Sequence, residues 1–262
     1  MKLSIITVSF NSLQLLEKTI RSVESSEFKN YEYIVVDGAS TDGTPAMLTE
    51  YEPIFSLHSI KFTWESSRDL GIYDAMNKGL AKATGDFVFF LNCGDTINST
   101  DTISKIFNRC GSAGFIYCYT KLVHPSGEIR NISITPQLLT YASMNKGMTV
   151  SHQGIIVQRN LCPYYDLEYT IMADYDWCLK ILKKKPVIYR HEDILTVYLL
   201  GGASAQQFQQ RWRDRWRLVK NYFGVKGVLV NMPFYVYDSL YWKSEFFRKL
   251  ADRRRHPTSK SN

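Results

Sequence analysis

The chain has 262 residues, 45% of them apolar and 22% charged, so it can bury the core of one large α/β domain and still carry an appendage. Its five cysteines are scattered and form no C-x-x-C pair, which argues against a disulfide framework or a zinc site and fits a reducing cytoplasm. A strand pattern begins at Leu3, so we expect no secretory signal peptide.

Strand and helix patterns alternate along the first half of the chain. Strands are predicted at 3–9, 33–37, 61–65 and 87–91, and helices at 13–23, 45–51 and 72–83. Beyond them we expect a helix at 100–109, a hairpin joining 115–123 to 128–134, and a helix at 174–184. This order predicts an α/β fold in which helices flank a mostly parallel sheet.

Positive charge is concentrated near the carboxyl terminus. Residues 205–262 hold 13 Lys and Arg against 4 Asp and Glu, a net charge of +9, whereas residues 1–204 hold 19 against 21. A basic segment can bind nucleic acid or anionic lipid, or only aid solubility. We expect a mildly acidic α/β domain at 1–204 and a basic extension, rich in aromatic residues, at 205–262.

Two of the predicted strands lead directly to a carboxylate. Residues 33–36 (YIVV) are followed by Asp37, and residues 87–91 (FVFFL) are followed by Asn92 and then Asp95. Ligands of open α/β sheets bind at the carboxyl ends of such strands. Acidic residues there, without a glycine-rich phosphate loop, indicate a site for a ribose or base and for a metal-bound diphosphate, which together describe a nucleotide-sugar.

Four motifs occur in a fixed order and resemble the family 2 glycosyltransferases, which have the Rossmann-like GT-A fold. They are TVSFN at 7–11, VDGASTDGT at 36–44, GIYDAMNKG at 71–79 and LNCGD at 91–95. The most similar subgroup is the bacterial exopolysaccharide enzymes of the colanic-acid type, and the resemblance covers about residues 1–205. It implies an inverting, metal-dependent enzyme of the hexosyltransferase type, acting in polysaccharide biosynthesis.

The resemblance also implies which residues bind the nucleotide of the donor. These residues are Thr7, Ser9, Asn11 and Asp37, with Asp69 and Asn77 as further candidates. Asp42 is expected to support the turn, and ordinary turn chemistry explains Asp42 and Ser40 equally well.

Asp95 is the candidate ligand for a divalent cation, Mn²⁺ or Mg²⁺. The leaving group is a nucleoside diphosphate, and hard cations bind carboxylate and phosphate oxygens. The family's usual D-x-D motif offers more carboxylates, whereas residues 92–95 (NCGD) offer one, with Asn92 as a weaker ligand. The alternative is that Asp95 only stabilises the turn.

Asp174 is the candidate catalytic base. Residues 172–180 (MADYDWCLK) resemble the family's E-D-x-x-L motif, with Ala173 in place of the first acid. Asp176 would point to a different helix face and is expected to be structural. Without the resemblance, Asp174 would be interpreted as a helix cap. A single base with direct attack implies inversion at the anomeric carbon.

Three more residues are candidates for contacts with the acceptor or diphosphate. His152 lies in a segment (SHQ, 151–153) that resembles one beside this region in the family, although a lone His is more often structural. Gly202 and Ser204 belong to a Gly-rich loop that could close over the donor, or that could be a plain turn.

The basic extension indicates association with the inner membrane surface. Arginines alternate with Trp212 and Trp216, and no stretch reaches the length of a membrane-spanning helix. A polyprenyl-diphosphate-linked or other glycan acceptor would suit such a location, on the cytoplasmic face. The alternative is a helix packed on the catalytic domain, and nucleic-acid binding is not expected because no recognition motif is present.

Two other functions remain open at this point. A sugar-nucleotidyltransferase would need a basic, Gly-rich phosphate loop after the first strand, where this chain has residues 9–12 (SFNS). A catalytically inactive module that binds glycan or nucleotide is compatible with the single carboxylate of residues 92–95.

Overall fold

The computed structural model describes residues 1–201 and 208–243, and the chain divides into two compact units, Met1–Arg211 and Trp212–Asn262. Each unit is described by itself. The predicted domain boundary between residues 204 and 205 falls outside the described residues.

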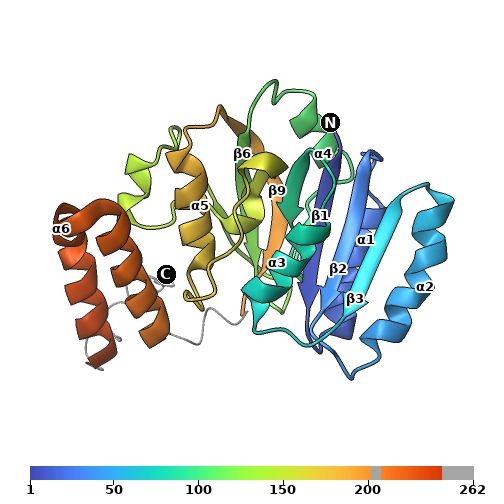
Figure 1. Ribbon diagram of the computed structural model, residues 1–262, viewed down its shortest axis with the longest axis horizontal. Helices are drawn as coiled ribbons and strands as arrows, with labels where there is room; N and C mark the ends of the chain where they lie inside the picture. Colours follow the sequence, from blue (N-terminus) through green and yellow to red (C-terminus); the bar gives the residue numbers. More distant parts are fainter. Residues whose placement is uncertain (202–207, 244–262) are drawn as a thin grey trace, which may run out of the picture. The chain divides into compact units, whose positions relative to one another are not determined.

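The first half of unit 1 is a parallel βαβ arrangement, as the alternating patterns predict (Figure 1). Strands β2, β1 and β4 are buried along their whole length because their apolar side chains are covered on both faces of the sheet. The elements are β1 (Leu3–Ser9), α1 (Leu13–Glu24), β2 (Tyr31–Asp37), α2 (Thr44–Leu57), β3 (Lys61–Ser66), α3 (Ile72–Lys82) and β4 (Phe87–Phe90).

The second half extends the same sheet with strands of both directions. The strand order is β3-β2-β1-β4-β8-β6-β9-β5, with β7 paired to β6. The predicted hairpin of β6 and β7 is confirmed. The elements are β5 (Thr96–Ile97), α4 (Thr102–Phe107), β6 (Phe115–Val123), β7 (Ile129–Ser133), β8 (Ile155–Gln158), α5 (Ala173–Lys183) and β9 (Ile188–Leu199), with short 3₁₀ turns at Ala142–Lys146, His152–Gly154 and Arg159–Leu161.

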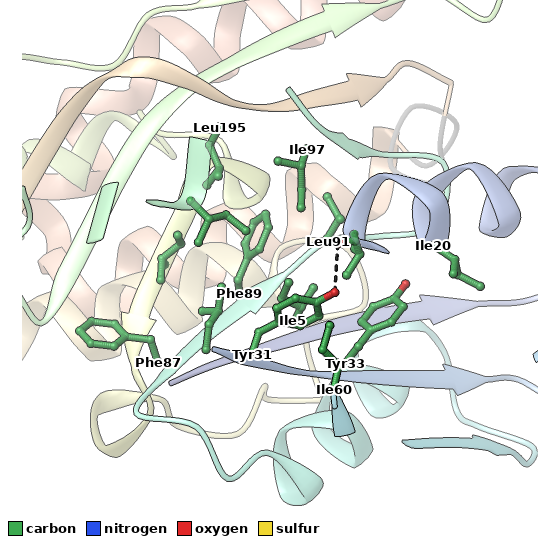
Figure 2. Packing of buried hydrophobic residues seen from close by; sticks show 14 of the residues in the cluster. Ile5, Ile20, Tyr31, Tyr33, Ile60, Phe87, Phe89, Leu91, Ile97 and Leu195 are labelled. Atoms are coloured by element: carbon green, nitrogen blue, oxygen red, sulfur yellow. Dashed lines mark hydrogen bonds between the residues drawn. The ribbon is translucent and has the colours of Figure 1, made fainter. Parts of the chain in front are cut away.

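Helices cover both faces of this sheet, which confirms the predicted α/β class. On one face, side chains of α1, α2 and α4 pack with alternate residues of the strands, and Figure 2 shows Ile5, Tyr33 and Phe89 in this cluster. Burying one such side chain stabilises the fold by about 1.5–3 kcal/mol. On the other face, α3 approaches β1 so closely that a Cβ at Gly79 would lie 2.4 Å from Ile6 Cγ2. Gly79 therefore permits this contact.

The structure differs from the sequence-based expectation in helix α2, which is longer, and in strands β5, β8 and β9, which were not predicted. Helix α2 continues through Pro53 to Leu57, because Phe55 is fully buried and stacks on Phe62 of β3 at 4.7 Å between ring centroids. Strand β9 was not predicted, since the charged run 190–193 (RHED) interrupts its apolar pattern. A register shift in the pairing with β6 accommodates that run.

Helix α6 (Phe208–Lys243), which belongs to unit 2 from Trp212 onward, consists of two helical arms on either side of a break at Gly224 (φ 63°, ψ −159°). The arms run antiparallel (Figure 1). The stacked rings of Trp212 and Trp216 on the first arm contact Tyr235 on the second, at centroid distances of 5.5 and 5.1 Å. Within residues 1–201 and 208–243, no helix is long and apolar enough to cross a bilayer.

Candidate functional site

Asp37 ends β2 and is fully buried, yet its carboxylate is well supplied with hydrogen-bond donors. Ser66 Oγ donates to Oδ2 at 2.6 Å, the Ser40 amide donates to Oδ2 at 2.9 Å, and Ser40 Oγ donates to Oδ1. Ser9 and Ser66 are the register partners of Asp37 on the neighbouring strands. The carboxyl ends of three parallel strands thus meet around one carboxylate.

The loops that follow β1 and β2 hold one another in place. The Asn11 amide donates to Ser40 Oγ at 2.7 Å, and Asn11 Oδ1 accepts from the Thr41 amide at 2.9 Å. Asn11 has φ 45°, a conformation that Asn tolerates better than most residues. Asp42 accepts from the Leu13 amide at the start of α1, and from Thr44, whose hydroxyl lowers the Asp42 pKa. Asp42 therefore supports the turn.

An exposed aromatic ring lies beside Asp37. Phe10 is 63% exposed, and its ring packs against Gly38, the residue that follows Asp37. A Cβ at Gly38 would lie 2.8 Å from Asp69 Oδ2 and 3.2 Å from the Phe10 ring, so only glycine allows this approach. Asp69, a predicted donor-site residue, is thereby brought next to the Asp37 turn. Sequence reasoning missed Phe10 as a site residue, although its position inside the TVSFN motif was the available signal.

Thr7 faces the interior of the sheet. Its hydroxyl donates to the Leu91 carbonyl at 2.7 Å and accepts from Tyr33 OH at 3.0 Å, and the residue is fully buried. These bonds tie β1 to β2 and to the end of β4. In this structure the Thr7 hydroxyl therefore links the strand ends on which the candidate site is built.

Asp95 lies at the same sheet edge as Asp37, on the other side of β1. The chain leaving β4 stays paired with β1 through the Cys93 amide and the Val8 carbonyl at 3.4 Å. Asp95 is 2% exposed, and its Oδ1 accepts from the Leu199 amide of β9 at 2.9 Å. Burial raises the pKa of Asp95 to about 8. A carboxylate in this environment needs a positive partner to be charged at neutral pH.

Two buried oxygens in this turn fit the requirement for a hard cation. Asp95 Oδ2 and Asn92 Oδ1 both lack a hydrogen-bond partner among the described residues. No group of three His, Cys, Asp or Glu side chains gathers as a metal site within the described part of the chain. Mg²⁺ and Mn²⁺ commonly take one or two carboxylates together with substrate phosphates, so the donor set suits a cation that arrives with a diphosphate.

Asp174 is the second residue of α5, and α3 brings it to the same sheet edge. Helix α3 starts where the chain returns from the carboxyl end of β3, and Tyr73 in its first turn lies 3.4 Å from Asp174 Oδ1. The Tyr175 amide donates to the same oxygen at 2.8 Å. Burial raises the pKa of Asp174 to about 6, although these two hydrogen bonds oppose the shift. Asp176, in contrast, pairs with Lys180 at 2.7 Å.

Asn77 and His152 both contact Tyr165, which agrees with the structural alternative that the sequence left open for His152. Both polar groups of the Asn77 side chain bond the backbone of Tyr165, at 2.7 and 2.9 Å. His152 Nε2 lies 2.7 Å from Tyr165 OH, and its ring packs among Phe90, Tyr165 and Trp177. Burial lowers the His152 pKa to about 4, so the ring is neutral. Neither geometry supports direct donor or diphosphate binding.

The remaining candidates and one cavity lie apart from these residues. Gly202 and Ser204 fall outside the described residues. A cavity of about 380 Å³ is lined by residues near α4, β6, β7 and β9, including Lys105, Tyr119 and His191. None of the predicted site residues lines it. We take the carboxyl edge of the sheet as the candidate site because Asp37, Asp95 and Asp174 lie there, and burial raises the pKa of the latter two.

Comparison with known sequences identifies glycosyltransferases as relatives of this chain. The family model described as glycosyl transferase family 2 matches residues 4–159. An uncharacterized glycosyltransferase of Mycobacterium tuberculosis is 31% identical over 264 residues, covering 94% of this chain and 96% of the relative. The Bacillus subtilis glycosyltransferase TuaG, whose name assigns it to teichuronic acid biosynthesis, is 26% identical over 83% of this chain and 84% of its own.

Solved structures share the fold. The S. aureus TarS fragment 1–349 in complex with UDP-GlcNAc has a TM-score of 0.65 at 19% identity, over 85% of this chain and 66% of that chain. The mannosyltransferase PcManGT from Pyrobaculum calidifontis, in complex with GDP-Man and Mn²⁺, has a TM-score of 0.57 at 15% identity, over 85% and 69%. These likenesses extend the agreement in fold to structures that hold nucleotide-sugars.

Proposed function

The chain belongs to glycosyl transferase family 2, and from that premise we propose that it moves a sugar from a nucleoside diphosphate donor to a glycan or polyprenyl-diphosphate-linked acceptor, with inversion at the anomeric carbon. The observation that carries the proposal is the set of three carboxyl groups at one sheet edge: Asp37, Asp95 and Asp174. A colanic-acid or other exopolysaccharide product remains part of the proposal.

The donor nucleotide is proposed to bind at the ends of β1, β2 and β3. Asp37 already accepts hydrogen bonds from three groups, which fix its carboxylate for a ribose hydroxyl. The exposed Phe10 ring offers a flat apolar surface for a base, with Asn11 and Asp69 beside it. Ser9 contributes to the same edge as the register partner of Asp37.

The diphosphate is proposed to lie at the turn after β4, with a divalent cation held by Asp95 and supported by Asn92. When bound, Mn²⁺ or Mg²⁺ would neutralise the charge that develops on the departing diphosphate. The unpartnered oxygens of these two side chains support this assignment, and so does the presence of Mn²⁺ in the PcManGT complex.

Asp174 is proposed to act as the base. The acceptor oxygen forms a bond to the anomeric carbon while the bond from that carbon to the diphosphate oxygen breaks, and the hydroxyl proton passes to the Asp174 carboxylate. Attack from the face opposite the leaving group inverts the anomeric configuration. A base with a pKa of about 6 is mostly charged at neutral pH and still takes a proton readily.

The test is turnover of nucleotide-sugars by matched aspartate variants. Asp174→Asn should lower turnover about 10²- to 10⁴-fold with little change in donor affinity. Asp176→Asn is the control, because Asp176 pairs with Lys180 on the same helix. NMR of the product should show the inverted anomer. Full activity in Asp174→Asn, or retention of configuration, would contradict the mechanism.

The inner membrane surface is the proposed place of action, and unit 2 is the proposed contact. Val225, Leu229, Met232 and Val236 follow helical spacing on the second arm of α6, and they are between 41% and 73% exposed. On the first arm, Arg213, Arg217 and Lys220 repeat at the same spacing and are exposed. An apolar stripe with basic residues suits anionic headgroups, where each Lys or Arg contributes about 1 kcal/mol.

Co-sedimentation with vesicles tests this location. We expect the full chain to bind vesicles that contain anionic lipid, and to bind zwitterionic vesicles less. The double variant Leu229→Asp/Met232→Asp should lose most of this binding. Leu57→Asp, at an apolar residue of α2 that is 84% exposed, should not. Equal binding by all three proteins would exclude the stripe as the membrane contact.

A further inference from the structure

Tyr73 joins the start of α3 to the turn that precedes α5. Its hydroxyl donates to the Ile171 carbonyl at 2.7 Å and lies 3.4 Å from Asp174 Oδ1. One hydroxyl proton serves two acceptors, and the shorter bond to Ile171 takes the larger share. The hydroxyl thus holds both the backbone just before α5 and one oxygen of its second residue.

Packing against neighbouring rings also holds the ring of Tyr73 in place. It stacks on Tyr165 with the centroids 5.4 Å apart and the planes 26° apart, and Tyr165 stacks on Trp177 of α5 at 5.5 Å and 11°. Asn77 bonds the Tyr165 backbone, and His152 bonds its hydroxyl. Two residues that the sequence assigned to ligand binding therefore fix the ring on which Tyr73 rests.

We propose that Tyr73 is a positioning residue for Asp174. It orients the Asp174 carboxyl so that Oδ1 is engaged by Tyr73 and the Tyr175 amide, while Oδ2 is the oxygen that takes the proton of the acceptor hydroxyl. This inference rests on the proposed function, in which Asp174 is the base.

The groups around Asp174 decide whether its protonation can be followed in the pH dependence of the rate. Its titratable neighbours are Tyr73 of α3, Tyr165 of the preceding loop, and Asp176 and Cys178 of its own helix. Burial raises the pKa of Tyr165 and of Cys178 well above their ordinary values, so both stay neutral near pH 6. Asp176 is paired with Lys180. At a Mn²⁺ or Mg²⁺ concentration that keeps the Asp95 carboxylate charged, the acidic limb of the rate profile therefore reports the protonation of Asp174.

The experiment is the pH dependence of kcat in Tyr73→Phe. The variant keeps the stacked ring and loses the hydroxyl, which lowers the pKa of Asp174 in the parent protein. We expect kcat to fall roughly tenfold, KM for the donor to stay unchanged, and the acidic limb to move to higher pH. This split separates an effect on the reacting geometry from an effect on donor binding.

Tyr31→Phe is the matched control. The Tyr31 hydroxyl also donates to one backbone carbonyl, that of Val23, at 3.1 Å, but it lies at the opposite edge of the sheet. We expect Tyr31→Phe to lower the melting temperature by about as much as Tyr73→Phe does, and to leave the pH profile of kcat unchanged. A parental kcat and pH profile in Tyr73→Phe would overturn the inference while Asp174→Asn stays inactive. An active Asp174→Asn would instead overturn the proposed function.

Discussion

At the residue scale, three aspartates at one sheet edge have three different surroundings. Asp37 is fully buried but receives hydrogen bonds from Ser40 and Ser66. Asp95 is buried with one oxygen that has no partner among the described residues. Asp174 lies at a helix start with a raised pKa. These differences suit the three proposed tasks: orienting a neutral hydroxyl, pairing with a cation, and exchanging a proton.

The raised pKa of Asp174 gives a definite pH dependence. The carboxyl must be deprotonated to act as a base, so turnover should rise with pH through about 6 and be lost below it. The measurement is kcat between pH 4.5 and 8, at donor and cation concentrations that saturate the parent protein. An acidic limb near pH 4, the ordinary range for Asp, would show that Asp174 is not the group that titrates.

Phe10 gives a second prediction at this scale. If its exposed ring stacks on the donor base, Phe10→Ala should weaken nucleotide binding by about 1–3 kcal/mol, or roughly 5- to 150-fold in Kd. Phe10→Tyr should bind as the parent does. Calorimetric titration with the nucleoside diphosphate decides the point, and an unchanged Kd in Phe10→Ala would remove the ring from the donor site.

At the element scale, the edge of the sheet opposite the site is fixed by a buried acid. Glu32 of β2 is 1% exposed, accepts from Ser4 Oγ at 2.7 Å and Thr84 Oγ1 at 2.6 Å, and pairs with Lys2 at 2.9 Å. Burial alone would raise its pKa, but the bonds from Thr84, Ser4 and Lys2 outweigh it and bring the pKa to about 2. The carboxylate therefore joins β1, β2 and the turn before β4.

Because the folded pKa of Glu32 is depressed, its contribution to stability is present above the unfolded value of 4.5 and is lost as pH falls toward 2. The shift corresponds to roughly 3 kcal/mol. Glu32→Gln should lower the free energy of unfolding by that order at pH 7, and the difference from the parent should shrink in acid. Urea titrations at pH 7 and pH 3.5 measure this, and a constant difference would contradict it.

The elements also show which features of the candidate site sequence patterns could predict and which they could not. Asp37 and Asp95 were predicted because a buried parallel strand places the residues after it at one edge, whatever the rest of the fold does. The contacts of Asn77 and His152 could not be predicted, because their partner, Tyr165, lies in an irregular loop whose path no periodicity reveals. The contact of Leu199 with Asp95 depends on β9, whose charged run conceals the strand.

At the whole-molecule scale, the proposed catalytic site and the proposed membrane contact belong to separate units. Unit 1 carries the sheet edge with its carboxyl groups, and unit 2 carries the apolar and basic stripes of α6. The proposed functions of the two units can therefore fail independently. A chain with a disrupted stripe should still turn over donor in solution, whereas Asp174→Asn should still bind vesicles.

The central claim is that Asp37 and Asp95 together bind a nucleotide-sugar. Its most direct test is calorimetric titration of UDP-, GDP-, CDP- and dTDP-sugars with and without Mn²⁺, into the parent protein, Asp37→Asn and Asp95→Asn. We expect one nucleotide to bind the parent tightly, Mn²⁺ to strengthen that binding, Asp37→Asn to weaken it with or without metal, and Asp95→Asn to abolish the Mn²⁺ effect. Equal affinity in all three proteins, or an Mn²⁺ effect that survives in Asp95→Asn, would contradict the account.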